Sequence, residues 1–304
     1  MYDRIVLPIE EGAARDSVDQ ARPLARELGC RLTLLHVHNA REAPPELEGL
    51  PQYRYQGVVE SWDQQDHDAE RHEVEWLRDM AAAVAADEPG LEVDSLVVHA
   101  PLTRAFRSED ESVLVVASAG AAHLDGLDPT TREILRAGDV PVLLFRPDVE
   151  MLPIRRMLIA LDGSPFSLEV LSPALELARA TGARVSLLEV VTRKGGLVGL
   201  LRPGDRSAET AERFLREVRG EIPEDLGPVD VRVVEMGNAA AGIASETRRE
   251  AIDLVAMATH GRGGLKRLLL GSVAESVVRG SRVAVLVYRP LGVVASERAV
   301  PAGG

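Results

Sequence analysis

The sequence is poor in cysteine and in aromatic residues. Among its 304 residues Cys30 is the single cysteine, so no disulfide can form within the chain. A lone cysteine suits a reducing compartment, and we expect a cytoplasmic protein. Aromatic side chains make up only 3% of the sequence, so its cores must be built mainly from Leu, Val, Ile and Ala.

Long apolar runs and an excess of basic residues are also missing. No run reaches the length of a membrane span, and no charged-then-apolar signal stands at the start. Acidic residues outnumber basic ones by 48 to 35, which gives a formal charge of −13. We therefore expect neither nucleic acid nor a membrane as a partner, and any anion site must be a local exception.

An internal repeat organises the chain. The apolar segment Arg4–Ile9 is echoed by Arg156–Leu161, and each precedes an amphipathic segment that ends at a glycine, Gly29 or Gly182. These glycines stand where a helix ends in the left-handed conformation. Strands then alternate with helices, which predicts a parallel α/β sheet with right-handed crossovers. Two copies with a period of about 150 residues predict a duplicated domain and not one large sheet.

The other elements repeat in the same order in both halves. In the first half we expect helices over 14–28 and 68–87 and strands over 31–37, 91–99, 113–117 and 140–145. In the second half we expect helices over 167–181 and 208–219 and strands over 184–190, 229–235, 254–258 and 283–288. A further helix precedes the fourth strand of each half. The two closing strands are apolar enough to pair edge to edge between the domains.

The stretch from Ala258 to Ser272 follows the fourth strand of the second half and has the features of a phosphate site. It reads Ala-Thr-His-Gly, nine residues, then Gly-Ser. Glycine permits φ > 0 and a close approach of main-chain N–H groups to an anion. A helix predicted from Gly271-Ser272 would direct its N–H groups and dipole at the ligand, and the Ser272 hydroxyl could cap the helix or donate to phosphate. From spacing alone, a tight structural turn remains the better interpretation.

Together with Asp162-Gly-Ser164 after one strand and Leu-Leu-Glu-Val190 in the next, this ending resembles the universal stress protein family. Nucleotide-binding members of that family carry Gly, two residues, Gly, nine residues, then Gly-Ser or Gly-Thr. Gly261, Gly271 and Ser272 match this motif. Ala258 replaces its first glycine and adds a methyl group, which would reduce affinity.

The resemblance covers both halves and implies two tandem Rossmann-like domains of the adenine nucleotide alpha hydrolase-like type. Each would be a five-stranded, mainly parallel sheet with helices on both faces. We expect a degenerate universal stress protein domain over 1–148, a second domain with the nucleotide-binding motif over 149–291, and a flexible tail over 292–304.

The resemblance also implies one site for ATP, together with Mg²⁺ or Mn²⁺, in the second half. Asp162 would lie near the adenine and ribose, Val190 beside the base, and Gly261, Gly271, Ser272 and Val273 around the phosphates. Placement at the carboxyl ends of parallel strands agrees with the general rule for open α/β sheets. We expect Gly271→Val to abolish binding without unfolding the domain. The implied site residues are Ala160, Asp162, Val190, Ala258, His260, Gly261, Arg262, Gly271, Ser272 and Val273.

Each of these residues also has a structural interpretation. Asp162-Gly-Ser-Pro could be only a turn and a helix cap, and Val190 is most simply core. His260 is more typical of a hydrogen-bonded structural histidine than of a catalytic base. Arg262 adjoins the glycine and is the better phosphate contact, whereas Lys266 and Arg267 are more typical of a solvated face.

The corresponding stretch of the first half, Ala117 to Thr131, has lost the features of the motif. Thr130 stands in place of Gly271, with Pro129 before it, and Glu10 stands in place of Asp162. Two acids in the bridging segment replace the basic residues of the second half, so an anion would be repelled. We therefore expect a single functional nucleotide site per chain.

Three classes of function remain open. The protein is either an ATP-binding regulatory or stress-response protein, a slow ATPase with only His260 and Asp162 as candidate groups, or a dimerisation module with vestigial sites. No catalytic residue is assigned. His36 and His38 could share one side of a strand, but no third ligand is evident, so we expect no metal site. The expected partners are an adenine nucleotide, the other domain of the same chain and a second copy in a homodimer.

Overall fold

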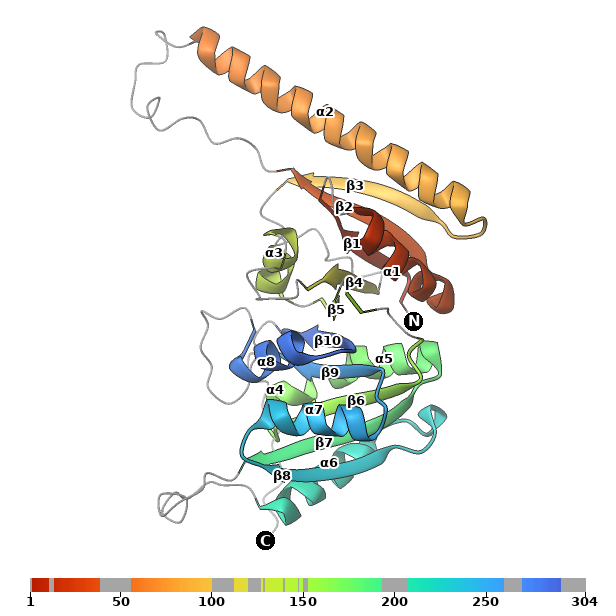
Figure 1. Ribbon diagram of the computed structural model, residues 1–304, viewed down its shortest axis with the longest axis vertical. Coiled ribbons are helices and arrows are strands. Elements are labelled where there is room, and N and C mark those ends of the chain that lie inside the picture. Colours follow the sequence, from red (N-terminus) through yellow and green to blue (C-terminus); the bar gives the residue numbers. More distant parts are fainter. Residues whose placement is uncertain are drawn as a thin grey trace.

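The computed structural model is a two-part α/β protein, shown in Figure 1. The residues that it describes are 2–10, 14–38, 56–99, 112–119, 127, 129–138, 140–146, 148–149, 153–192, 207–259 and 270–290.

Strands and helices alternate along both halves. The first half contains β1 (Arg4–Pro8), α1 (Ala14–Leu28), β2 (Arg31–His38), α2 (Gln56–Asp87), β3 (Val93–His99), β4 (Val113–Ser118), α3 (Pro129–Ala137) and β5 (Val142–Phe145). The second half contains β6 (Arg156–Leu161), α4 (Pro165–Leu168), α5 (Leu171–Thr181), β7 (Arg184–Thr192), α6 (Ala208–Glu221), a short 3-10 helix (Glu224–Leu226), β8 (Asp230–Met236), α7 (Ala239–Arg249), β9 (Leu254–Ala258), α8 (Ser272–Gly280) and β10 (Ala284–Tyr288).

All ten strands belong to one sheet with the order β3-β2-β1-β4-β5-β10-β9-β6-β7-β8. Neighbouring strands are parallel except β5 and β10, which pair antiparallel with Leu143 opposite Leu286. Figure 1 shows this pair in the middle of the molecule, between the two halves. The edge-to-edge pairing predicted for the two closing strands is confirmed, and it joins the strands of both halves into one continuous sheet, where the repeat alone predicted two separate sheets. The apolar closing strands complete each other's hydrogen bonds and join the two sets of strands.

Several element boundaries agree with the sequence patterns and others differ. Gly29 and Gly182 have φ of 63° and 66°, which confirms the left-handed helix ends. Helix α2 begins at Gln56, twelve residues before the predicted start at Asp68, because no glycine or proline interrupts this stretch after Gly57. Strand β3 begins at Val93 and not at Leu91. The helix expected before β4 and the tail over 292–304 lie outside the described residues.

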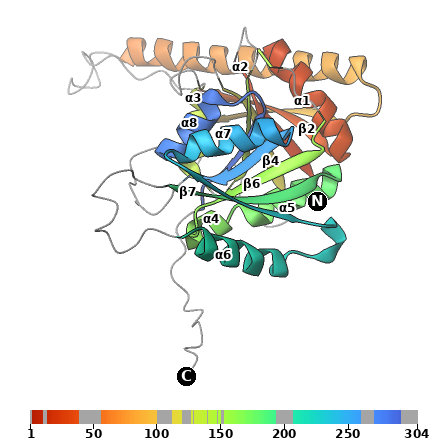
Figure 2. The ribbon, with the colours of Figure 1, turned by 60° about the horizontal axis from the view of Figure 1, so that its bottom comes forward.

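Two hydrophobic cores cover the two faces of the sheet. Alternate strand residues such as Ile5 and Val6 belong to opposite cores, as the two-residue period of a strand requires. One core includes buried residues of α1, α2, α5 and α6, and the other includes those of α3, α7 and α8. Figure 2 shows α7 and α6 on opposite sides of the second-half strands. None of the helices described is both long and apolar enough to span a bilayer.

Side chains also join the two halves away from the β5–β10 pair. The buried Tyr2 hydroxyl donates to the Pro173 carbonyl oxygen at 2.9 Å, and burial raises the pKa of this phenol. The Ser112 hydroxyl donates to Glu176 Oε1 at 3.0 Å. Arg289, directly after β10, donates to the Leu135 carbonyl at the end of α3 at 3.3 Å. The halves are therefore held together by buried and partly buried polar contacts as well as by the sheet.

Candidate functional site

The carboxyl ends of β6, β7 and β9 lie side by side in the sheet and form the edge where the predicted site residues meet. Strand β6 stands between β9 and β7. The chain continues from β6 to β7 and β8 in one direction and then crosses to β9 on the other side of β6. A sheet of this kind binds ligands where the strand order reverses, and here that point lies between β6 and β9.

The turn after β6 is held by its own side chains. Asp162 is exposed, and its Oδ1 accepts a hydrogen bond from the Ser164 N–H at 2.9 Å. Gly163 between them has φ of 76°, a conformation that favours glycine. The Ser164 hydroxyl then caps α4 by accepting from the Ser167 N–H at 3.2 Å, and Pro165 occupies the first helical position. The segment therefore forms the expected turn and helix cap, whatever Asp162 contributes to a ligand.

The turn before α8 brings two main-chain segments into close contact. The buried Thr259 follows β9, and its N–H donates to the Tyr288 carbonyl oxygen at 3.0 Å. Its own carbonyl oxygen accepts from the Gly271 N–H at 2.6 Å. A Cβ atom on Gly271 would lie 2.6 Å from that same oxygen. Glycine is therefore required here by the Thr259 carbonyl.

This contact corrects the reason given above for Gly271. Its φ is −65° and its ψ is 157°, so the residue does not use the left-handed conformation that glycine permits. The missing side chain instead allows the Gly271 main chain to approach the Thr259 carbonyl oxygen within the turn. We now expect Gly271→Val to destabilise the fold as well as any ligand site, because the added side chain would strike buried main chain.

Helix α8 begins without a side-chain cap. Gly271 is its N-cap residue and has no side chain to offer, so of the two roles predicted for the Ser272 hydroxyl the helix cap is wrong, and donation to phosphate stays a prediction. The helix begins directly after Gly271, so Ser272 and Val273 are its first two residues. Both are exposed. The first N–H groups of a helix have no partner within it, and its dipole places partial positive charge there. This end of α8 can therefore accept an anion.

Val190 lies near the end of β7 and is half-buried against α7. A Cβ atom on Gly242 of α7 would lie 2.7 Å from Val190 Cγ1, so this helix glycine lets the helix pack directly on the valine. Ala160, near the end of β6, is half-buried next to the same core. Both residues belong to the packing of the sheet edge, as the core interpretation of Val190 expects.

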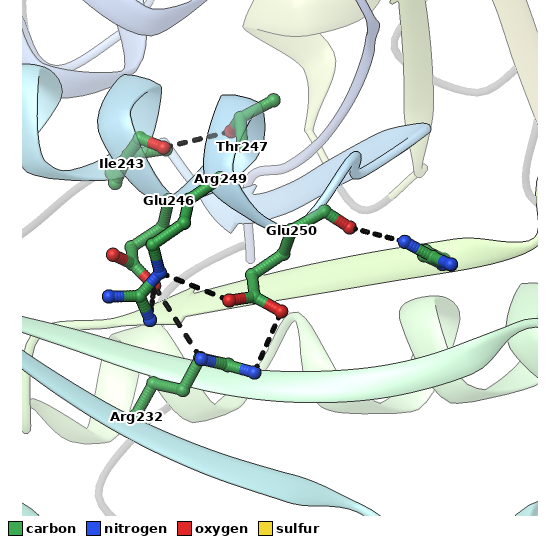
Figure 3. A network of polar contacts seen from close by, with 7 residues as sticks. Arg232, Ile243, Glu246, Thr247, Arg249 and Glu250 are labelled. Carbon is green, nitrogen blue, oxygen red and sulfur yellow. Dashed lines mark hydrogen bonds and ion pairs between the residues drawn. The ribbon is translucent and has the colours of Figure 1, made fainter.

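Helix α7 is anchored at both of its ends. At its start the Asn238 side chain accepts from the Ala241 N–H at 3.1 Å. At its end the buried Glu246 pairs with Arg249 at 2.8 Å, and Arg232 of β8 pairs with Glu250 at 2.9 Å. Figure 3 shows how Arg232, Glu246, Arg249 and Glu250 form one network between the helix and the strand. The network fixes the helix that presents Gly242 to Val190.

The structure brings seven of the ten predicted site residues to this sheet edge. They are Ala160, Asp162, Val190, Ala258, Gly271, Ser272 and Val273. The other three, His260, Gly261 and Arg262, lie outside the described residues, as do Lys266 and Arg267. Thr259 and Gly242 shape the edge but were not predicted, since a buried threonine and a helix glycine carry no signal of their own in the sequence.

The corresponding edge of the first half is built differently. Helix α3 begins at Pro129, so Thr130, the counterpart of Gly271, is already its second residue and is buried. The strand pairing before this helix also differs by one residue. Ala258 stands opposite Tyr288, but in the first half Ser118, the residue after Ala117, stands opposite Phe145. A buried threonine inside the helix cannot form the glycine N-cap that begins α8.

A cluster of histidines and glutamates occupies the strand ends of the first half. His38 Nδ1 lies 2.8 Å from Glu73 Oε2, and His99 Nε2 lies 3.0 Å from Glu70 Oε1. The His36 Nδ1–H donates to the Ile9 carbonyl oxygen at 3.0 Å. The two glutamates come from α2, which the sequence patterns did not relate to these histidines. In the part of the chain that the structure describes, no group of three such side chains is arranged to hold a metal ion.

Comparison with known proteins places this architecture in one class. A family model described as the universal stress protein family matches residues 1–146 and again residues 153–289. The fold and the duplicated sheet thus belong to a protein with two such domains in tandem.

Relatives of similar length support the same assignment. A universal stress protein of Mycolicibacterium smegmatis is 27% identical over 296 residues, which cover 94% of this chain and 97% of that protein. One from Mycobacterium tuberculosis is 30% identical over 270 residues, covering 85% and 87% of the two chains. The crystal structure of a universal stress protein from Archaeoglobus fulgidus matches with a TM-score of 0.62 at 20% identity, covering 94% and 98%. The chain belongs to the universal stress protein family.

Proposed function

We propose that the protein binds ATP at a single site in its second half and acts as a nucleotide-responsive regulatory or stress-response protein. The observation that carries this proposal is the start of α8 at the strand-order reversal. There Gly271 begins the helix without a side-chain cap, and the exposed Asp162 directly follows the neighbouring strand β6.

The proposed site assigns each part of the nucleotide to a different strand end. The N–H groups of Ser272 and Val273 would receive phosphate oxygens at the positive end of the α8 dipole. A magnesium or manganese ion would neutralise the phosphates further. Asp162 would accept hydrogen bonds from the ribose hydroxyls, and Ala160 and Val190 would border the base. In sequence, Ala258, His260, Gly261 and Arg262 complete the phosphate-binding stretch.

The first half supports the proposal as an internal control. It has the same alternation of strands and helices, but its helix α3 begins at Pro129 and includes the buried Thr130, and histidine–glutamate pairs lie at the ends of β2 and β3. We therefore assign no nucleotide to the first half, which we propose acts as a degenerate partner domain. Regulation would follow from linkage, because a ligand that prefers one arrangement of the protein shifts the population toward it.

The test uses the purified full chain. Nucleotide released by heat denaturation and identified by chromatography, together with calorimetric titration of ATP and Mg²⁺, should show about one ATP per chain. At an ATP concentration of about 100 times Kd, stability should rise by about 2.7 kcal/mol. Phosphate release followed over hours distinguishes a binding protein from a slow ATPase.

Two matched variants locate the site. Asp162→Ala should weaken ATP binding by about tenfold, since it removes a charged hydrogen-bond acceptor. Glu10→Ala changes the corresponding acid of the first half and should leave the affinity unchanged. If the wild-type protein neither releases nor binds ATP, the proposed function is wrong. If Glu10→Ala and not Asp162→Ala weakens binding, the site lies in the other half.

A further inference from the structure

Two of the exposed large apolar side chains stand in the helices that begin at the proposed site. The large hydrophobic residues most exposed in that part of the chain are Leu96, Phe166 and Val273. Leu96 lies on β3 at the far edge of the first half. Phe166 and Val273 are 41% and 37% exposed and stand in the first turns of α4 and α8, the two helices that follow β6 and β9.

Phe166 stands at the strand-order reversal itself. Helix α4 follows β6 along the chain but contacts β9 as well as β6. It therefore lies beside both strand ends between which ligands bind in sheets of this kind. Ser167, next to Phe166, is buried, so the phenylalanine is on the outer side of the turn.

The backbone that carries Phe166 is held in place before any ligand arrives. The Ser167 N–H donates to the Ser164 hydroxyl at 3.2 Å, and the Ser167 hydroxyl donates to the Ser164 carbonyl oxygen at 2.8 Å. Pro165 fixes the backbone angle just before the phenylalanine. An aromatic ring on so constrained a turn loses little conformational entropy when it binds another group.

The surroundings of Phe166 favour a small flat ligand over a protein partner. Docking surfaces for proteins are contiguous apolar patches of several hundred square ångströms. Phe166 is instead close in sequence to the exposed Asp162 and the half-exposed Glu169, and the other helix start carries the exposed Ser272. An aromatic ring close to polar groups matches a purine base, which offers an apolar face and polar edges.

We infer that Phe166 stacks on the purine base and gives the site its preference for a base-bearing nucleotide. The inference rests on the proposed function, since it requires a nucleotide in the second half. The main-chain groups of α8 recognise phosphate whatever base is attached to it. Contact with the ring supplies affinity that a free triphosphate cannot gain.

The experiment compares ATP with inorganic tripolyphosphate, both with Mg²⁺, by calorimetric titration of the full chain. Phe166→Ala should weaken ATP binding by about tenfold, since base–aromatic stacking contributes on this scale, and should leave the tripolyphosphate affinity unchanged. Leu96→Ala removes an exposed apolar side chain from the first half and should change neither. Phe166→Trp should retain ATP affinity, and its added fluorescence should be quenched by ATP but not by tripolyphosphate.

The possible outcomes separate this inference from the function on which it rests. If the wild type binds ATP and Phe166→Ala binds it equally well, the stacking inference is wrong and the proposed function stands. If Phe166→Ala weakens the binding of ATP and of tripolyphosphate equally, Phe166 acts through the turn, and the stacking inference is again wrong. Unchanged ATP affinity with loss of self-association in sedimentation would assign the ring to a protein interface. A wild type that binds no ATP removes both proposals.

Discussion

Replacing Gly271 by alanine tests the close contact at the start of α8. The added Cβ atom would lie 2.6 Å from the Thr259 carbonyl oxygen, whereas ordinary contacts of this kind are 3.4–4 Å. The two groups must therefore separate by about 0.8 Å. Neither group can move freely, because the Thr259 N–H is hydrogen-bonded to the Tyr288 carbonyl oxygen and the Gly271 carbonyl oxygen accepts from the Glu275 N–H at 2.8 Å.

The cost has two parts. Overpacking a rigid site costs about 1–3 kcal/mol. Separation also weakens the hydrogen bond from the Gly271 N–H to Thr259, which contributes about 0.5–1.5 kcal/mol. We expect Gly271→Ala to lower the free energy of unfolding by about 2–4 kcal/mol. Since the N-terminus of α8 moves with the contact, ATP affinity should also fall by about tenfold or more.

Urea unfolding followed by circular dichroism measures the first effect, and calorimetric titration measures the second. Gly280→Ala on the same helix is the control, because a Cβ atom there meets nothing within 4 Å. This variant should be unchanged or up to about 1 kcal/mol more stable, as alanine is the better helix residue. A Gly271→Ala protein whose unfolding midpoint equals that of Gly280→Ala would refute the reasoning.

Three further predictions concern packing, charge and the single cysteine. Gly242→Ala places a Cβ atom 2.7 Å from Val190 and should destabilise the protein by about 1–3 kcal/mol in urea unfolding. The control is Gly220→Ala in α6, whose added Cβ atom has no neighbour within 4 Å and which should stabilise the protein slightly. Equal unfolding midpoints for the two variants would contradict the packing argument. Glu246→Ala leaves Arg232 and Arg249 without their buried partner and should cost about 1–3 kcal/mol. Truncation of the exposed Arg249 should cost less than about 1 kcal/mol, and the reverse ranking of the two unfolding midpoints would show that Glu246 is not the centre of the network. Burial raises the pKa of the Cys30 thiol to about 11, so iodoacetamide at pH 8 should alkylate the folded protein about 100-fold more slowly than the urea-unfolded protein. The free energy of unfolding should fall as the pH rises from about 9 toward 11, because only the unfolded state releases the thiol proton in this range. Similar alkylation rates for the two states would contradict the raised pKa.

The repeat and the strand–helix alternation could be predicted because they depend on local periodicity. Apolar segments such as Arg156–Leu161 and the helix-ending glycines Gly29 and Gly182 carry their signal within a few residues. The apolar closing strands predicted an edge-to-edge pairing, but not that it would join both halves into one continuous sheet. Whether two apolar closing strands pair within one chain depends on the geometry of both halves and not on either strand alone.

The candidate site divides in the same way. The family resemblance implied that Asp162, Val190 and Ala258 lie at the carboxyl ends of parallel strands, and the strand order places these ends side by side. The reason for Gly271 was missed because the clash that it avoids involves Thr259, twelve residues earlier, through a contact that no spacing rule encodes. The pairing of His38 with Glu73 was missed for a related cause, since the partner lies 35 residues away on a helix.

The antiparallel contact of β5 with β10 has a consequence for how the two halves can diverge. In a symmetric homodimer both sites must change together, because one gene encodes both copies. Here the two copies lie in one chain, so each half can change on its own: α8 begins at the uncapped Gly271, whereas its counterpart α3 already contains the buried Thr130. The covalent link also makes the junction independent of protein concentration. Dilution that would dissociate a dimer leaves this asymmetric pair intact.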